Sequence, residues 1–147
     1  MPKPVLVNAK GQAFLVWVGG FGMNVELLKI NTVDEAKEAI ASVGASPVSV
    51  NIMAPKAVFR VIKVTGVSAT AANILKQDML AKGGDAAVHA GVVNCRQNVS
   101  DVILMGTVKQ YRQVIKGLRI QPVGLPKLAE KIKELLEDSL EPTTSQE

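Results

Sequence analysis

The stretch from Lys76 to Cys95 reads "KQDMLAKGGDAAVHAGVVNC", and the prediction of the fold depends on its Gly83–Gly84 pair. The residues before the pair follow a helical pattern that begins at Ser68, a residue type that caps helices. Gly83 can adopt the left-handed conformation that ends a helix. The run "DAAVHAGVVN" after the pair is predicted to be extended. The stretch therefore predicts a helix that stops, turns and continues as a strand.

The residues on the N-terminal side continue this alternation of strands and helices. Residues 4–20 predict a hairpin of two apolar runs around a polar turn, and residues 25–30 ("VELLKI") predict a third strand. Residues 31–44 predict a helix with a capping box at its start and a glycine at its end. Residues 45–57 contain two prolines and are predicted to be irregular. Residues 58–64 ("VFRVIKV") alternate as a strand does, with their basic side chains expected to reach solvent.

The C-terminal side adds one strand and two helices. "SDVILMG", at residues 100–106, is apolar from its third residue onward, which is typical of a strand at the centre of a sheet. Thr107 and Gln110 have the spacing of a capping box at the start of a helix. Pro126 is expected to open the last helix.

These elements predict a single domain of the α/β class, with α+β as the alternative. We expect a mixed β-sheet with about four helices packed on it. Residues 1–24 are assigned to the hairpin and a glycine-rich loop, 25–137 to the main domain, and 138–147 to a polar tail. The sequence shows no internal repeat.

The composition limits the class of protein. Of the 147 residues, 48% are hydrophobic and only 3% are aromatic, and the formal net charge is +4. The basic residues are scattered and few aromatic side chains could stack on bases, so nucleic-acid binding is not expected. The apolar runs are far shorter than the roughly 20 residues of a membrane-spanning helix. With one cysteine and no secretory signal, we expect a cytoplasmic protein.

The turn Gly83–Gly84–Asp85 has two interpretations. Consecutive glycines can direct N–H groups at a phosphate or a carboxylate. Phosphate-binding loops precede a helix, however, whereas this pair follows one, and the C-terminus of a helix carries a partial negative charge. We therefore favour a turn that ends the helix, and keep a small ligand pocket at this turn as the alternative.

His89 and Cys95 are the only histidine and the only cysteine in the chain. A zinc site needs three or four ligands, so no metal site is predicted. Nothing marks Cys95 as an activated nucleophile. No cofactor motif is present, and no cofactor and no catalytic residue are predicted.

Two polar surfaces are candidates for binding a ligand or a partner. Four polar residues on the predicted helix before Gly83 are not explained by core packing, and they are Asn73, Lys76, Gln77 and Asp78. A second surface is the basic face of the helix that follows Thr107. It consists of Lys109, Arg112, Lys116 and Arg119, spaced three, four and three residues apart.

Several short segments of the sequence, taken together, indicate a protein family more specifically than any of these motifs does. They are "MAPK" (Met53–Lys56), "ANILKQDML" (Ala72–Leu80), "GGDAAV" (Gly83–Val88), "LMGT" (Leu104–Thr107), "QY" (Gln110–Tyr111) and "QPVGL" (Gln121–Leu125). In this order they resemble the additional N-terminal domain of a subset of bacterial dihydropteroate synthases. The resemblance covers residues 25–137. Val123 departs from it, because an aromatic residue is expected there.

The resemblance implies a place in folate or one-carbon metabolism and does not imply a catalytic role. Dihydropteroate synthase joins a pterin pyrophosphate to p-aminobenzoate on a barrel of roughly 250 residues, and its catalytic residues lie in that barrel. We therefore expect a non-catalytic accessory module that binds a separate synthase barrel, a second copy of itself, or a small anionic or pterin-like ligand. The alternatives are a small sensor or enzyme with its own pocket, and a structural module that forms oligomers.

Overall fold

The computed structural model describes residues 6–7, 13–14, 22–94 and 96–140. The chain divides into two compact units, Met1–Ile30 and Asn31–Glu147, and each is described by itself.

The described residues of the first unit include one pair of short strands. β1 (Leu6–Val7) and β2 (Ala13–Phe14) are antiparallel, which confirms the predicted hairpin in its paired residues. The turn between them and most of the glycine-rich loop lie outside the described residues. The prediction of a strand at residues 25–30 is wrong, because these residues form no helix or strand. An apolar run becomes a strand only beside a hydrogen-bonded neighbour, and within the described part of the chain these residues have none.

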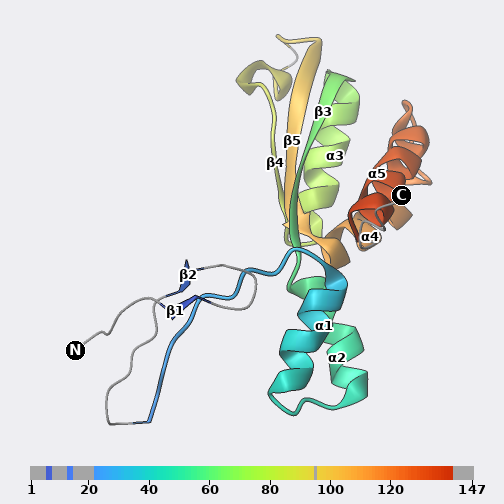
Figure 1. The fold of residues 1–147 in the computed structure, drawn as a ribbon. Coiled ribbons are helices and arrows are strands. Elements are labelled where there is room, and N and C mark those ends of the chain that lie inside the picture. Colours follow the sequence, from blue (N-terminus) through green and yellow to red (C-terminus); the bar gives the residue numbers. More distant parts are fainter. Residues whose placement is uncertain (1–5, 8–12, 15–21, 95, 141–147) are drawn as a thin grey trace, which may run out of the picture. The chain divides into compact units, whose positions relative to one another are not determined.

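The second unit is built on a three-stranded sheet in the order β3–β5–β4 (Figure 1). These strands are Phe59–Ser68 (β3), Val99–Thr107 (β5) and Asp85–Ala87 (β4), and both pairs are antiparallel. Because β5 lies between the other two, the prediction of a central strand there is confirmed. The expected combination of a β-sheet with helices packed on it is confirmed as well.

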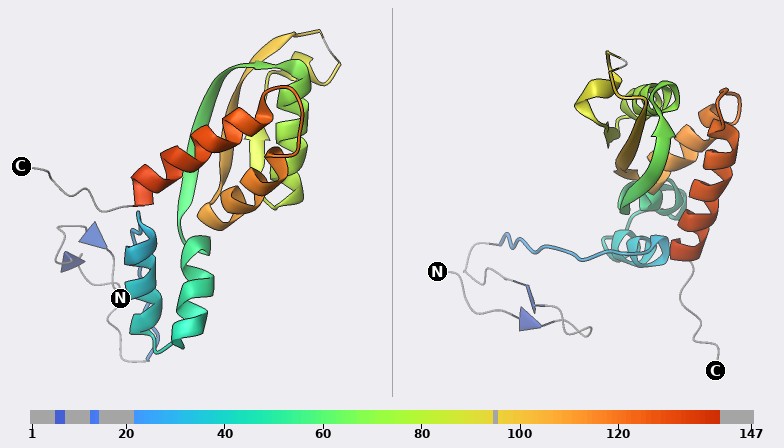
Figure 2. Two further views of the ribbon diagram at one scale, coloured as in Figure 1. Left: turned by 90° about the vertical axis from the view of Figure 1, so that its right-hand side faces the viewer. Right: turned by 90° about the horizontal axis from the view of Figure 1, so that it is seen from above.

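Three helices cover one face of this sheet (Figures 1 and 2). α3 (Ala69–Ala81) packs on the strands, α4 (Val108–Leu118) packs against α3, and α5 (Leu125–Leu140) packs against α4. The core between helices and sheet consists mostly of aliphatic side chains. Tyr111 is the one aromatic residue of this core among the described residues; it is fully buried and donates a hydrogen bond to the carbonyl of Arg60 at 2.8 Å.

The predicted helix caps are confirmed. The Ser68 hydroxyl accepts a hydrogen bond from the amide of Ala71 at 3.2 Å. Thr107 and Gln110 form a complete capping box, with distances of 3.2 and 2.9 Å. Thr32 caps α1 (Val33–Ser42) in the same way as Ser68 caps α3.

The segment predicted to be irregular is mostly helical. It contains α2 (Pro47–Met53) and a 3₁₀ turn, η1 (Ala54–Lys56). Proline is well tolerated in the first turn of a helix, where its missing N–H has no partner in any case. Ser46 precedes it and caps the helix by accepting a hydrogen bond from the amide of Ser49 at 3.2 Å.

Two strands differ in length from the prediction. β3 continues to Ser68 across a bulge between Val64 and Val67, where Gly66 has a φ of +73°. The run after the Gly83–Gly84 pair is extended only as far as Ala87, and a 3₁₀ turn, η2 (Ala90–Val92), follows it. A bulge and a short edge strand depend on cross-strand partners, which periodicity alone does not identify.

Candidate functional site

The predicted polar surface of α3 is largely engaged in contacts within the domain. The Asn73 side-chain amide donates to the carbonyl of Val92 at 3.3 Å. The Lys76 ammonium group donates to the carbonyl of Ala86 at 2.9 Å. Both side chains are half-buried and connect α3 to β4 and to the turn after it. Gln77 is exposed to solvent, and within the described part of the chain its side chain has no hydrogen bond.

Asp78 faces in another direction. Its Oδ2 atom is buried and accepts no hydrogen bond from the residues that the structure describes. A Cβ atom placed on Gly117 of α4 would lie 3.7 Å from this oxygen. The carboxylate of Asp78 therefore lies toward α4, whereas Lys76 reaches β4, and the two charges do not form one site.

The Gly83–Gly84–Asp85 turn ends α3, as the preferred interpretation predicts. Gly83 has a φ of +88°, and its amide donates to Leu80 at 3.1 Å. The amide of Gly84 donates to Met79 at 2.9 Å. Both amides are therefore committed to carbonyls of the helix. The Asp85 carboxylate accepts a hydrogen bond from the amide of Ala86 at 2.7 Å.

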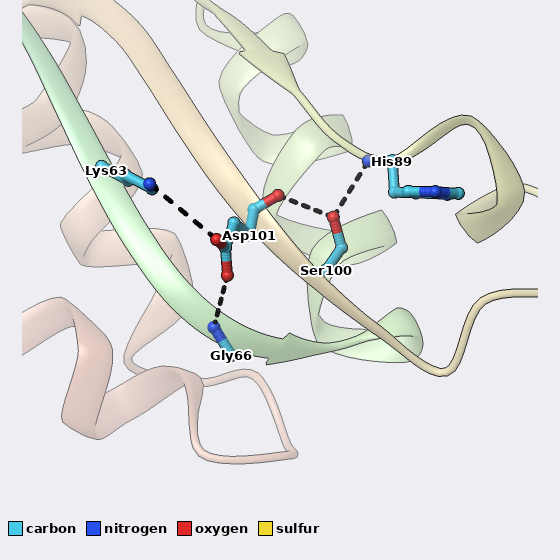
Figure 3. A network of polar contacts seen from close by, with 5 residues as sticks. All are labelled: Lys63, Gly66, His89, Ser100 and Asp101. Carbon is cyan, nitrogen blue, oxygen red and sulfur yellow. Dashed lines mark hydrogen bonds and ion pairs between the residues drawn. The ribbon is translucent and has the colours of Figure 1, made fainter.

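His89 belongs to a polar network that joins the end of β4 to β5 (Figure 3). Its amide donates to the Ser100 hydroxyl at 2.9 Å, and this hydroxyl donates to the carbonyl of Asp101 at 2.6 Å. The ring nitrogen Nδ1 of His89 accepts a hydrogen bond from the amide of Gly91 at 2.9 Å. His89 therefore has a structural role in starting η2. Cys95 lies outside the described residues.

The same network continues to β3 through the carboxylate of Asp101 (Figure 3). One oxygen accepts a hydrogen bond from the amide of Gly66 at 3.1 Å, and the other lies 3.9 Å from the ammonium group of Lys63. Asp101 thereby holds the bulge of β3. Among the described residues, no cluster of histidine, cysteine or acidic side chains has the composition of a metal site.

The predicted basic face of α4 lines a groove of about 310 Å³ against α5. Arg112, Lys116 and Arg119 contribute to it, whereas Lys109 does not. Part of the positive charge is neutralised, because Arg119 pairs with Glu130 at 3.0 Å. On the opposite wall, a second ion pair joins Lys133 and Glu137 at 3.9 Å.

A second groove of about 620 Å³ lies between β3 and the first half of α5. We call it the lysine groove. Among the residues that the structure describes, its charged lining residues are Lys63, Lys127 and Lys131, and none of its lining residues is acidic. The sequence does not predict it, because residues 62–71 and 123–135 meet only through tertiary packing. Its one signal in the sequence is the spacing of Lys127 and Lys131, which lie one helical turn apart.

The face of the sheet opposite the helices carries exposed apolar side chains. Side chains alternate along a strand, so Phe59 and Val61 lie on the face opposite the buried Ile62. Phe59 is 57% exposed and Val61 is 63% exposed. Val61 pairs with Met105 of β5, and the exposed Ile103 is a neighbour on the same strand. We call Phe59, Val61, Ile103 and Met105 the open sheet face.

Within the described residues, no helix combines the length and the apolar character needed to cross a bilayer.

Two curated proteins are similar to this chain. One is a probable bifunctional folylpolyglutamate synthase/dihydropteroate synthase of Halobacterium salinarum, 30% identical over 116 residues, which are 78% of this chain and 14% of that protein. The other is a bifunctional dihydropteroate synthase/dihydropteroate reductase of Helicobacter pylori, 29% identical over 100 residues, which are 68% of this chain and 26% of that protein. This chain therefore corresponds to a minor part of each relative. No model of a protein family and no solved structure matches the chain.

Proposed function

We propose that the second unit is a non-catalytic accessory module of dihydropteroate synthase, acting in folate or pterin metabolism. The observation that carries this proposal is the partial coverage of the relatives. Both are named as dihydropteroate synthases, and both are much longer than the region that this chain matches. The matched region of at most 116 residues is about half the length of a synthase barrel of roughly 250 residues. The synthase activity of the relatives would then belong to another part of their chains.

The open sheet face supports binding to that other part. Exposed apolar side chains that gather on one face are typical of protein contact sites. In each relative the matched region is part of a longer polypeptide, and the rest of that polypeptide could supply the partner domain. We therefore assign the open sheet face to the synthase barrel, supplied either in the same polypeptide or separately.

Association with the barrel tests this proposal. The 147-residue chain would be titrated with the dihydropteroate synthase barrel encoded in the same genome, supplied as a separate polypeptide, and binding followed by calorimetry. We expect a complex that Val61→Asp weakens by about tenfold or more, since a charge in a desolvated apolar contact is costly. Val43→Asp is the matched control, because Val43 is also an exposed valine but lies at the end of α1.

Two results would contradict the proposal. One is the absence of any complex with the wild-type chain. The other is a stable homodimer, seen by light scattering of the chain alone, that Val61→Asp dissociates. That second result would assign the open sheet face to a second copy of this chain.

A further inference from the structure

We propose that the lysine groove binds a small aromatic carboxylate. This inference deepens the proposed function, and it rests on that function for the chemical class of the ligand. The volume of about 620 Å³ lies within the range of small-molecule sites, which is roughly 300–1,000 Å³. Most of the lining is apolar, as is usual for such sites.

The charge of the groove selects an anion. Lys127 and Lys131 lie at positions i and i+4 of α5, where like charges repel each other. Within the described part of the chain, neither has an ion pair or a side-chain hydrogen bond. Lys63 of β3 also lines the groove, but its side chain lies on the same face of the sheet as Phe59 and Val61. There its ammonium group lies 3.9 Å from Asp101, with both side chains more than half exposed. A bound carboxylate would relieve the repulsion between the two lysines of α5.

The groove between α4 and α5 is a weaker candidate for the same ligand. Two of its four basic side chains already have acidic partners, Glu130 and Glu137. It also has about half the volume of the lysine groove. Its apolar lining is limited to Ile115 and Leu136, which leaves little surface for an aromatic ring.

The floor of the lysine groove selects an apolar body for the ligand. Ile62 and Val67 of β3 and Ile132 of α5 belong to the core, and Leu128 and Leu135 extend this apolar surface toward solvent. A ligand that fits both features has a flat ring system with a carboxylate at one end. Dihydropteroate, for whose synthesis both relatives are named, has this chemistry, since a pterin ring is joined to p-aminobenzoate.

A strained loop forms the end wall of the groove. Val123 has a φ of +56° and Gly124 a φ of +79°, and both line the groove immediately before α5 begins. A β-branched residue with positive φ is a genuine outlier. Strain of this kind gathers at ligand sites, where the surrounding structure maintains it. Here the strained loop directly precedes the helix that carries Lys127 and Lys131.

Direct binding measurements test this inference. The 147-residue chain would be titrated with pteroate, the stable oxidised counterpart of dihydropteroate, and separately with p-aminobenzoate and inorganic pyrophosphate. We expect pteroate to bind and the double variant Lys127→Gln/Lys131→Gln to raise its Kd about tenfold or more. The matched control is Lys116→Gln/Lys133→Gln, which removes two charges from the other groove and is expected to leave the Kd within about twofold.

Each other outcome counts against the inference. If wild type does not bind pteroate, or if both double variants weaken it equally, the lysine groove is not the site. If pyrophosphate binds as tightly as pteroate, the groove is a general anion site and the aromatic part of the inference is wrong. Association with the barrel is assigned to a different surface, the open sheet face, and is tested with different variants, Val61→Asp and Val43→Asp. Failure of pteroate binding with intact barrel association would therefore overturn only this inference.

Discussion

The ammonium group of Lys76 lies 2.9 Å from the main-chain carbonyl oxygen of Ala86. β4 has three residues and pairs with β5 on one side only, so its other side is an edge of the sheet. Exposed strand edges are templates for unwanted pairing, and a lysine that caps an edge carbonyl reduces this risk. A residue that the sequence offers as a binding group thus also has a structural role.

Replacing Lys76 with methionine should destabilise the domain. Methionine keeps the length of the side chain but removes the hydrogen bond, and bonds to charged groups contribute about 1.5–3 kcal/mol. We expect a loss of about 1–2 kcal/mol in the free energy of unfolding, measured by urea denaturation, and faster amide exchange in β4. Gln77→Met is the control, because Gln77 is exposed, and its effect should stay within about 0.5 kcal/mol. Equal stability of the two variants would contradict the structural role.

Gly84 is required by a close approach of two elements. A Cβ atom at this position would lie 2.8 Å from the carbonyl oxygen of Met105 and 2.9 Å from Cε of Met79. The first of these atoms is backbone of the central strand and cannot move aside. We expect Gly84→Ala to lower the free energy of unfolding by about 2 kcal/mol or more, measured by thermal and urea denaturation.

A glycine of α4 provides the matched control for this substitution. A Cβ at Gly117 would lie 3.7 Å from Asp78, which is ordinary contact, and the residue is helical. Gly117→Ala should therefore stabilise the domain by about 0.5–1 kcal/mol through helix propensity. If both substitutions changed stability in the same direction, the steric explanation for Gly84 would be wrong.

The local signals in the sequence predict much of this fold. Ser68, Thr32 and the Thr107–Gln110 pair all cap helices, because capping depends on residues three positions apart. The end of α3 is also predicted by a local signal, because Gly83 directly follows the C-cap residue of the helix. The prediction at residues 45–57 fails because Ser46 caps a helix that starts at Pro47, where a proline favours a helical start.

Long-range relationships account for what the sequence does not predict. The bulge at Gly66 depends on Asp101, 35 residues away. The lysine groove joins β3 to α5 across roughly 60 residues of chain, so neither half reveals it. Core packing does not explain Lys76 and Asn73, because their carbonyl partners on β4 and η2 approach them only in the folded domain. Their proposed part in binding remains a prediction.

Tyr111 should give the domain a distinct sensitivity to alkaline pH. Burial raises the pKa of its phenol well above the ordinary value near 10. The unfolded chain releases this proton above about pH 10, whereas the folded chain keeps it. The folded state then binds more protons than the unfolded state, so this contribution to stability is complete below about pH 10 and is lost as pH rises further.

The variant Tyr111→Phe isolates this effect. It loses the hydrogen bond to Arg60, and we expect it to be about 1 kcal/mol less stable than wild type at pH 8. Above pH 10 wild type should lose about 1.4 kcal/mol per pH unit relative to the variant, so the difference should vanish near pH 11. Urea denaturation at several pH values measures both. A constant difference from pH 8 to pH 11 would show that the phenol ionises equally well in the folded state.

The strain at Val123 predicts a substitution that stabilises the domain. The left-handed conformation costs a residue with a Cβ about 1–2 kcal/mol, and asparagine tolerates it better than valine does. Val123 is about half exposed, so little packing is lost on its replacement. We expect Val123→Asn to raise the free energy of unfolding by about 0.5–1 kcal/mol in urea denaturation. Val93 is also exposed but has a φ of −61°, so Val93→Asn should bring no gain. Equal effects of the two substitutions would mean that the loop before α5 is not strained.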